Sequence, residues 1–246
     1  METSGISETI ANNMIDKKVR NNVDNALKYM KQTNINVISV FDDDYPQMLK
    51  EIYAPPICLY IKGNLQLLKM QNISLIGCRK CSQYGKKTAY YFSYNLSKAG
   101  FNIVSGLARG IDSYSHIGCL AAKGKTIAVM GSGLDNIYPK ENEQLVNEII
   151  KQNGAIITQY PLGTKPEKNN FPARNRIISG LSKAVLVIEA RAKSGTLITV
   201  DFALEQGKDV FAVPGNINSA NSVGTNELIK QGAIPVCNYK DILDNI

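Results

Sequence analysis

Apolar residues gather in short runs over most of the chain, and longer amphipathic stretches separate these runs. Each run holds a few residues rich in Val and Ile: ISLIG (73–77), FNIVSG (101–106), TIAVMG (126–131), AIITQ (155–159), AVLVIEA (184–190), DVFAVPG (209–215) and AIPVCN (233–238). Runs of this length and composition are typical of strands that are covered on both faces. We therefore predict a buried strand at each of them.

The stretches between these runs have the spacing of helices. Examples are GKKTAYYFSYNLSKAG (85–100), NEQLVNEIIKQNG (142–154) and LITVDFALEQGK (197–208). Strands that alternate with helices in this way form a parallel sheet with helices on both of its faces. The predicted fold is therefore α/β, an extended Rossmann-like, doubly wound and mostly parallel sheet.

Residues 1–55 differ from the rest and predict a small helical N-terminal segment, followed by a Rossmann-like domain over 56–246. The stretch ETIANNMIDKKVRNNVDNALKYMKQ (8–32) is polar, with apolar residues at helical spacing. NINVISV (34–40) fits a short strand, and YPQMLKEI (45–52) fits one further helix. Pro55 and Pro56 then interrupt the pattern, and CLYIKGNL leads out of the segment.

Several of the predicted strands end in residues that suit phosphate. Glycines allow a close approach of the backbone, and free N–H groups at a helix start donate to phosphate oxygens. The candidates are Gly77 and Arg79 after the first run, then Ser105, Gly106, Arg109, Gly110 and Asp112, and then Lys193, Ser194, Gly195 and Thr196. Taken singly, each loop is explained as well by tight turns and by helix capping through Ser194 and Thr196. With GSGLDNIYP (131–139) after the third run and PGNINS (214–219) after the sixth, five such loops on one sheet edge favour a phosphate-binding surface.

Composition adds a charge preference and excludes some classes of protein. A net charge of +7, from 28 basic and 21 acidic residues, favours an anionic partner. No apolar run approaches the ~20 residues of a membrane helix, and the N-terminus lacks an export pattern. The five cysteines are scattered, and Cys78 and Cys81 form a C-x-x-C without a second metal-binding pair. We predict a soluble cytoplasmic protein that has no metal, no cofactor and no membrane partner.

The common nucleotide and catalytic motifs are missing. GSGLDN (131–136) has Asn136 where a dinucleotide fingerprint has Gly or Ala, and there is no P-loop pattern. His116 lies in a predicted helix, where we expect it to pack or cap rather than act as a base. Glu189 is open to three roles: catalytic acid, acceptor for a backbone N–H, or partner of a loop arginine. We identify no catalytic residues and predict that the protein is not an enzyme.

The stretch FPARNR (171–176) is the most unusual in the chain. A helix beginning near Ala173 would place Arg174, Asn175 and Arg176 in its first turn, where cations oppose the helix dipole unless an anion is bound. Phe171, next to the polar loop that carries Lys168, is available for stacking on a base. The alternative is that Phe171 fills the core while the arginines pair with acids such as Glu189. We favour single-stranded nucleic acid, because neither a recognition helix nor a basic stripe for a duplex is evident.

The order of motifs resembles the DNA-processing protein A family (DprA, also called Smf). The motifs are GCR, SGLARGID…H, AVMGSGLDNIYP, YPLGTKP, FPARNRIISGL, VLVIEA…SGTLITVDFALEQGKDVFAVPG and GTNELIKQGA, within roughly residues 45–238. The resemblance implies a homodimeric protein that binds single-stranded DNA, protects incoming DNA and helps load the RecA recombinase in natural transformation. It also implies that Gly224–Val236 lies near the dimer surface.

Carried over by motif, the resemblance assigns residues to a DNA-binding groove. It gives a phosphate pocket to Arg79, Ser105, Gly106, Arg109, Gly110 and Asp112, backbone and base contacts to Lys168 and Phe171, and the rest of the groove to Arg174, Asn175 and Arg176. Ser194, Gly195 and Thr196 belong to the same predicted edge. Many members carry a C-terminal winged helix, which we do not expect before Ile246.

One alternative function stays open at this point, a sensor or hydrolase of small nucleotides on a related Rossmann-like fold. The S-G-T helix start at Ser194 resembles that of the lysine-decarboxylase-like nucleotide hydrolases. Those proteins, however, carry P-G-G-x-G-T followed by paired glutamates, and EARAKSGTLITVDFALEQ (189–206) has neither.

Overall fold

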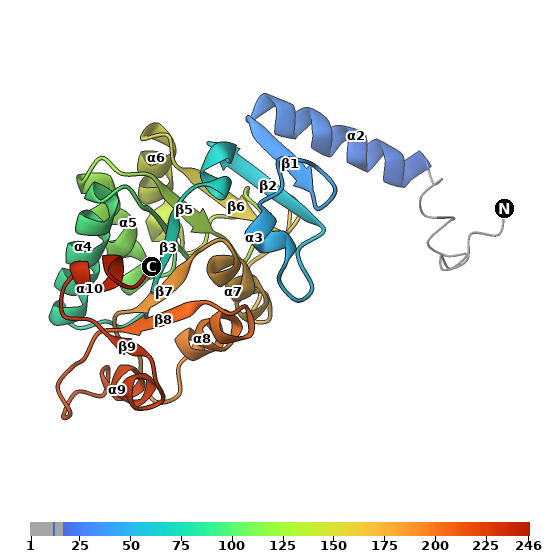
Figure 1. Ribbon diagram of the computed structural model, residues 1–246. Coiled ribbons are helices and arrows are strands. Elements are labelled where there is room, and N and C mark those ends of the chain that lie inside the picture. The colour runs from blue at the N-terminus through green and yellow to red at the C-terminus, as the bar shows by residue number, and fades with distance from the viewer. Residues whose placement is uncertain (1–11, 13–16) are drawn as a thin grey trace. The chain divides into compact units, whose positions relative to one another are not determined.

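A computed structural model describes residue 12 and residues 17–246 of the chain (Figure 1). Contacts between Cα atoms divide the chain into two compact units, residues 1–36 and 37–246. The part of the predicted N-terminal helix that precedes residue 17 falls largely outside the described residues. None of the helices described is both long enough and apolar enough to cross a membrane.

The described part of the first unit consists mainly of helix α2 (Lys17–Gln32). Its Val23 and Leu27 leave about half of their surface exposed, at 51% and 53%. Helix α2 confirms the helical spacing seen in the sequence.

The second unit is built on one sheet, whose strand order is β1-β2-β6-β5-β4-β3-β7-β8-β9. Its strands are β1 (Ile35–Ser39, which begins at the unit boundary), β2 (Cys58–Gly63), β3 (Asn72–Ile76), β4 (Asn102–Ser105), β5 (Thr126–Val129), β6 (Ala155–Thr158), β7 (Ala184–Val187), β8 (Asp209–Ala212) and β9 (Ile234–Pro235). From β6 to β9 all neighbours are parallel, and β2 runs antiparallel to β6. The predicted sheet and each predicted strand are confirmed.

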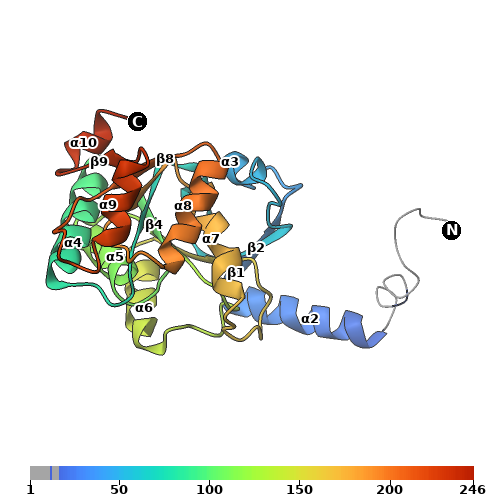
Figure 2. The same cartoon turned by 90° about the horizontal axis from the view of Figure 1, so that it is seen from below.

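Helices cover both faces of this sheet (Figures 1 and 2). One face carries α4 (Gln83–Lys98), α5 (Ile111–Ala121) and α6 (Glu143–Lys151), and the other carries α3 (Gln47–Lys50), α7 (Asn170–Gly180) and α8 (Gly195–Glu205). The short helices η1 (Leu65–Lys69), η2 (Lys140–Asn142), α9 (Val223–Lys230) and α10 (Lys240–Leu243) complete the unit. Alternate residues of each strand enter the two cores, so Leu75 packs with Phe92 of α4 while Ile76 joins the cluster that holds Ile177 of α7.

The structure differs from the sequence prediction around residues 37–63. The sequence predicts a domain boundary after residue 55, whereas the compact units divide after Asn36. The physical reason is burial: Ile38, Leu49 and Ile52 belong to the same hydrophobic cluster as the sheet. The hydroxyl of the buried Tyr45 also donates to the carbonyl of Pro56, at 2.7 Å.

Strand β2 was not predicted, because CLYIKG alternates between buried and half-exposed residues instead of forming an apolar run.

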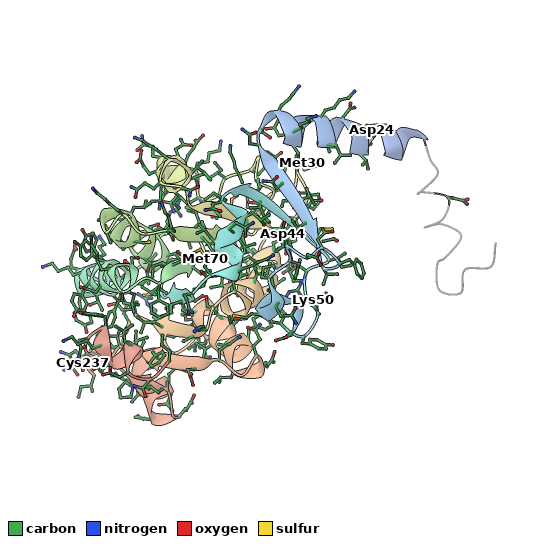
Figure 3. The ribbon with its side chains drawn as sticks, turned by 45° about the horizontal axis from the view of Figure 1, so that its top comes forward. Asp24, Met30, Asp44, Lys50, Met70 and Cys237 are labelled. Carbon is green, nitrogen blue, oxygen red and sulfur yellow. The ribbon has the colours of Figure 1, made fainter. Side chains whose placement is uncertain are left out.

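A salt bridge between Asp44 and Lys69 of η1, with 2.8 Å between Nζ and Oδ1, joins the loop before α3 to η1. Asp44 and Met70 lie in that region in Figure 3, and Lys50 marks α3.

Candidate nucleic-acid interface

A crevice of about 650 Å³ opens at the carboxyl ends of the strands. Its walls come from the end of β3, the loop between β4 and α5, helix α7 and the loop between β7 and α8. The chain runs from β3 to β6 in one direction and then returns to place β7 on the other side of β3. Such a switch point is where doubly wound sheets bind their ligands.

Phe171 forms one wall of the crevice and is half-buried. The Arg79 guanidinium carbon lies 5.4 Å from the centre of its ring, and the ring of Tyr138 lies 5.6 Å away at a tilt of 48°. Gly131 lies behind the ring: a Cβ there would come within 2.9 Å of it. Phe171 therefore has one supported side and still lines the open crevice, so it is neither fully exposed nor a core side chain.

The walls of the crevice are basic. Arg79, Lys168, Arg191 and Lys193 line it, and Asp112 is its one acidic lining residue. Among the described residues, none of these four cations forms a salt bridge with an acidic side chain. The sequence prediction omitted Arg191 and Tyr138 from the site, whereas Lys193 was among the phosphate-binding candidates in the loop that opens α8.

Arg174 and Asp112 lie at the floor, where both are buried. Arg174 Nη1 donates to the carbonyls of Gly106, at 2.7 Å, and of Val129. Asp112 accepts the backbone N–H of Ala108 at 3.2 Å. Burial lowers the pKa of Arg174 to about 10 and raises that of Asp112, while the two charges attract each other. The pair fixes the loop between β4 and α5.

Other residues of that loop shape it from behind. The hydroxyl of the buried Ser105 donates to Leu75 O at 2.7 Å. Gly106 lies against Asp112 and Arg174, with no room for a side chain. Gly110 has a φ of 77°, and a Cβ there would clash with the carbonyl oxygens of residues 78 and 79. None of these three lines the crevice itself.

Arg109 lies at the rim and points to a carboxylate. Its Nε and Nη2 each lie 2.7 Å from an oxygen of Glu141, in a pairing that is exposed to solvent. Beside it a small hollow continues from the crevice and is lined by Arg79, Tyr138 and Phe171.

The FPARNR segment is placed differently from the prediction. Helix α7 begins at Asn170, three residues before Ala173, because Pro172 fits within a first turn that needs no N–H donor there. The arginines are therefore past the first turn, and the prediction that their charges oppose the helix dipole is wrong. Asn175 does line the crevice, but Arg176 does not: its Nη2 donates to Gln159 Oε1 at 2.8 Å.

The loop after β7 both caps a helix and lines the crevice. Ser194 Oγ accepts the N–H of Thr196 at 3.2 Å, which confirms the capping alternative. Ser194, Gly195 and Thr196 all line the crevice, and Asn175 Nδ2 lies 3.4 Å from Gly195 O.

Two further expectations concern His116 and Glu189. His116 is buried in α5 with Nδ1 2.7 Å from Thr126 Oγ1, and burial lowers its pKa to about 3, so packing is confirmed. Glu189 accepts the N–H of Ser82 at 2.9 Å and also the Ser82 hydroxyl. The backbone-acceptor role of Glu189 is confirmed, and the proposed pairing with arginine is wrong.

Comparison with known proteins agrees with the geometry. Residues 36–246 match the profile of the family described as DNA recombination-mediator protein A. The chain belongs to this family. Protein Smf of Escherichia coli is 41% identical over 227 residues; the aligned part covers 92% of this chain but only 61% of the Smf protein.

Two solved structures of family members superpose closely. The X-ray structure of DNA processing protein A from Streptococcus pneumoniae has a TM-score of 0.83 and 42% identity, covering 89% of this chain and 77% of that one. A structure of the Helicobacter pylori protein, described as revealing its single-stranded DNA binding mode, has a TM-score of 0.77 and 31% identity. It covers 85% of this chain and 94% of that one.

Proposed function

We propose that this DprA-family chain binds single-stranded DNA in the crevice at the carboxyl ends of β3 and β7. The observation that carries the proposal is the group of Phe171, Arg79 and Lys168 on one crevice. The aromatic ring offers a stacking surface, and the cations attract phosphates. The relative from H. pylori, which is described as binding single-stranded DNA, supports it.

The support behind the ring of Phe171 suits a role in base stacking. Gly131 leaves room for the ring, and Arg79 and Tyr138 restrict its movement. A base that enters the crevice therefore meets a surface that is already ordered, so less side-chain entropy is lost on binding. Stacking does not depend on base identity, and we expect binding with little sequence preference.

We propose that the protein takes part in recombination and does not catalyse a reaction on the bound DNA. The polar side chains on the crevice floor are engaged in structural contacts, since Asp112 accepts from Ala108 and lies against Arg174. The family description, a mediator of recombination, supports a protein without catalytic activity. We propose that the protein acts in the cytoplasm, protects incoming DNA and helps load the RecA recombinase as a homodimer. The support for these roles is family membership.

The test is fluorescence anisotropy of a labelled thymidine oligonucleotide at two salt concentrations. We expect salt-sensitive binding, little competition by a matched duplex and none by a mononucleotide. The change Phe171→Ala should weaken binding by about 5- to 150-fold, the equivalent of ~1–3 kcal/mol for one lost stack. The control is Lys151→Ala, which removes an exposed lysine of α6.

Equal losses from Phe171→Ala and Lys151→Ala would remove the stacking role. Absence of binding at low salt, together with a rise in melting temperature on adding a mononucleotide, would assign the crevice to a small nucleotide instead.

A further inference from the structure

One side of α4 carries a row of two tyrosines with a lysine at each end: Lys86, Tyr90, Tyr94 and Lys98. These residues are four apart, so they lie one above another on one side of the helix. We call them the α4 row. Over twelve residues the row extends about 18 Å along the helix axis.

The side chains of the α4 row are arranged around aromatic rings. The rings of Tyr90 and Tyr94 stack at 6.1 Å with an interplanar angle of 15°. Lys98 Nζ lies 5.8 Å from the centre of the Tyr94 ring, and Lys86 Nζ lies 5.5 Å from that of Tyr114 on α5. Tyrosine rings and lysine ammonium groups thus lie next to one another at both ends of the row.

Charge on this surface has a single sign. Helix α4 (QYGKKTAYYFSYNLSK) contains three lysines and no acidic residue. None of its lysines takes part in a salt bridge within the described part of the chain. Within the row Tyr90 and Lys98 are exposed and Lys86 and Tyr94 are half-buried, and the flanking Lys87 and Tyr91 are exposed. The face is therefore complementary to a polyanion.

The α4 row also continues from the crevice. Arg79 lines the crevice, and only Lys80, Cys81 and Ser82 separate it from the first residue of α4. The carbonyl of residue 79 leaves no room for a Cβ at Gly110, so it lies close to this residue, which immediately precedes α5 and its Tyr114. A strand that leaves the crevice past Arg79 thus meets the N-terminal end of the row.

We propose that the α4 row is a second binding site for single-stranded DNA, occupied by the part of the strand that leaves the crevice. This inference rests on the proposed function. Partly exposed aromatic rings with a lysine at each end of the row suit splayed bases and their phosphates. A duplex keeps its bases stacked inside and leaves tyrosine faces unused, and protein interfaces are depleted in lysine. Both properties favour a single strand.

Crosslinking tests the site directly. A thymidine oligonucleotide of about 30 nucleotides, substituted with 5-bromodeoxyuridine, is irradiated on the full chain and digested with trypsin. Cleavage after Lys87 and Lys98 isolates the peptide 88–98, which holds three tyrosines, and cleavage after Lys168 and Arg174 isolates 169–174, which holds Phe171. We expect adducts on both peptides. Adducts on 169–174 alone would overturn the second site.

Affinity provides the second measurement. The variant Tyr90→Leu/Tyr94→Leu keeps good helix formers, and we expect it to bind the long oligonucleotide about tenfold more weakly than wild type. Binding of a short oligonucleotide, about 6 nucleotides long, should stay unchanged, because it fills the crevice only. Lys86→Gln/Lys98→Gln should reduce the salt dependence of long-strand binding by about 1.4 in log–log slope. Lys151→Gln is the control and should leave that slope unchanged.

The outcomes separate the two proposals. If the wild type binds the oligonucleotides and both double variants match it at both lengths, the α4 row is not a site and the crevice remains one. If a duplex competes with the long strand on wild type but not on the lysine variant, the row binds duplex DNA and the inference is wrong. If the wild type binds no single strand at low salt, the proposed function itself fails.

Discussion

Arg174 offers the sharpest test of how the crevice is held together. Its guanidinium is buried, and Nη1 donates to the carbonyls of Gly106 and Val129. The change Arg174→Met keeps a long side chain but removes the charge and the donors. Two buried carbonyls then lose their partner, and Asp112 loses the cation that stabilises its charge most strongly.

The magnitude follows from those losses. Removing one member of a buried charge pair costs about 3–5 kcal/mol, because the other charge stays buried and uncompensated. In a protein of this size each kcal/mol lowers the melting temperature by about 2–4 °C, so we expect a drop of about 6–20 °C. The double variant Asp112→Asn/Arg174→Met should lose less than Arg174→Met alone, because it leaves no unpaired charge; the coupling is about 0.5–3 kcal/mol.

Tyrosine fluorescence during heating measures these differences, since the chain has twelve tyrosines and no tryptophan. A melting temperature for Arg174→Met within about 2 °C of wild type would refute a structural role for the pair. If that unchanged stability came with lost binding of single-stranded DNA, Arg174 would instead contact the DNA.

Three further predictions concern single side chains. Glu141→Gln should free Arg109 from its exposed pairing. Anisotropy should then show a higher affinity for single-stranded DNA and a log affinity–log salt slope that is steeper by about 0.7. An unchanged affinity would mean that Arg109 contacts no phosphate. His116 is the only histidine, and because its folded-state pKa is lowered to about 3 the unfolded chain binds the proton first. The stability that it contributes above about pH 6.5 is therefore lost as the pH falls, by up to about 1.4 kcal/mol per pH unit. Between about pH 6.5 and 5, urea unfolding should show a smaller loss of unfolding free energy for His116→Gln than for wild type. Iodoacetamide should modify the exposed Cys237 (Figure 3) long before the buried Cys78, whose pKa burial and the nearby Glu189 raise to about 12; equal rates by mass spectrometry would contradict this.

The sheet was predictable because burial on both faces leaves a simple signal in the sequence. Strands such as Ala184–Val187 consist only of apolar residues that are fully buried. Strand β2 escaped notice because Tyr60 and Lys62 alternate with the buried Leu59 and Ile61. Such a pattern also fits a loop that crosses the surface, and its pairing with β1 and β6 makes it a strand.

The crevice was predictable in its position, but the direction of each side chain was not. Phosphate-suited loops at strand ends correctly indicated the crevice. Arg174 and Arg176 were taken as a pair, yet residues two apart in a helix point to nearly opposite sides, so one arginine reaches the crevice floor and the other reaches Gln159. Helical phase also reveals the row from Lys86 to Lys98, which is not evident when the lysines are only counted.

The short strand β9 limits how two copies of the chain can join. It consists of Ile234 and Pro235 only, and it forms one edge of the sheet through pairing with β8. Proline has no backbone N–H to offer to an added strand, and two residues provide little template. The sheet therefore cannot extend across this edge into a neighbouring molecule. Assembly at this end therefore relies on side chains, which makes its strength adjustable by single substitutions.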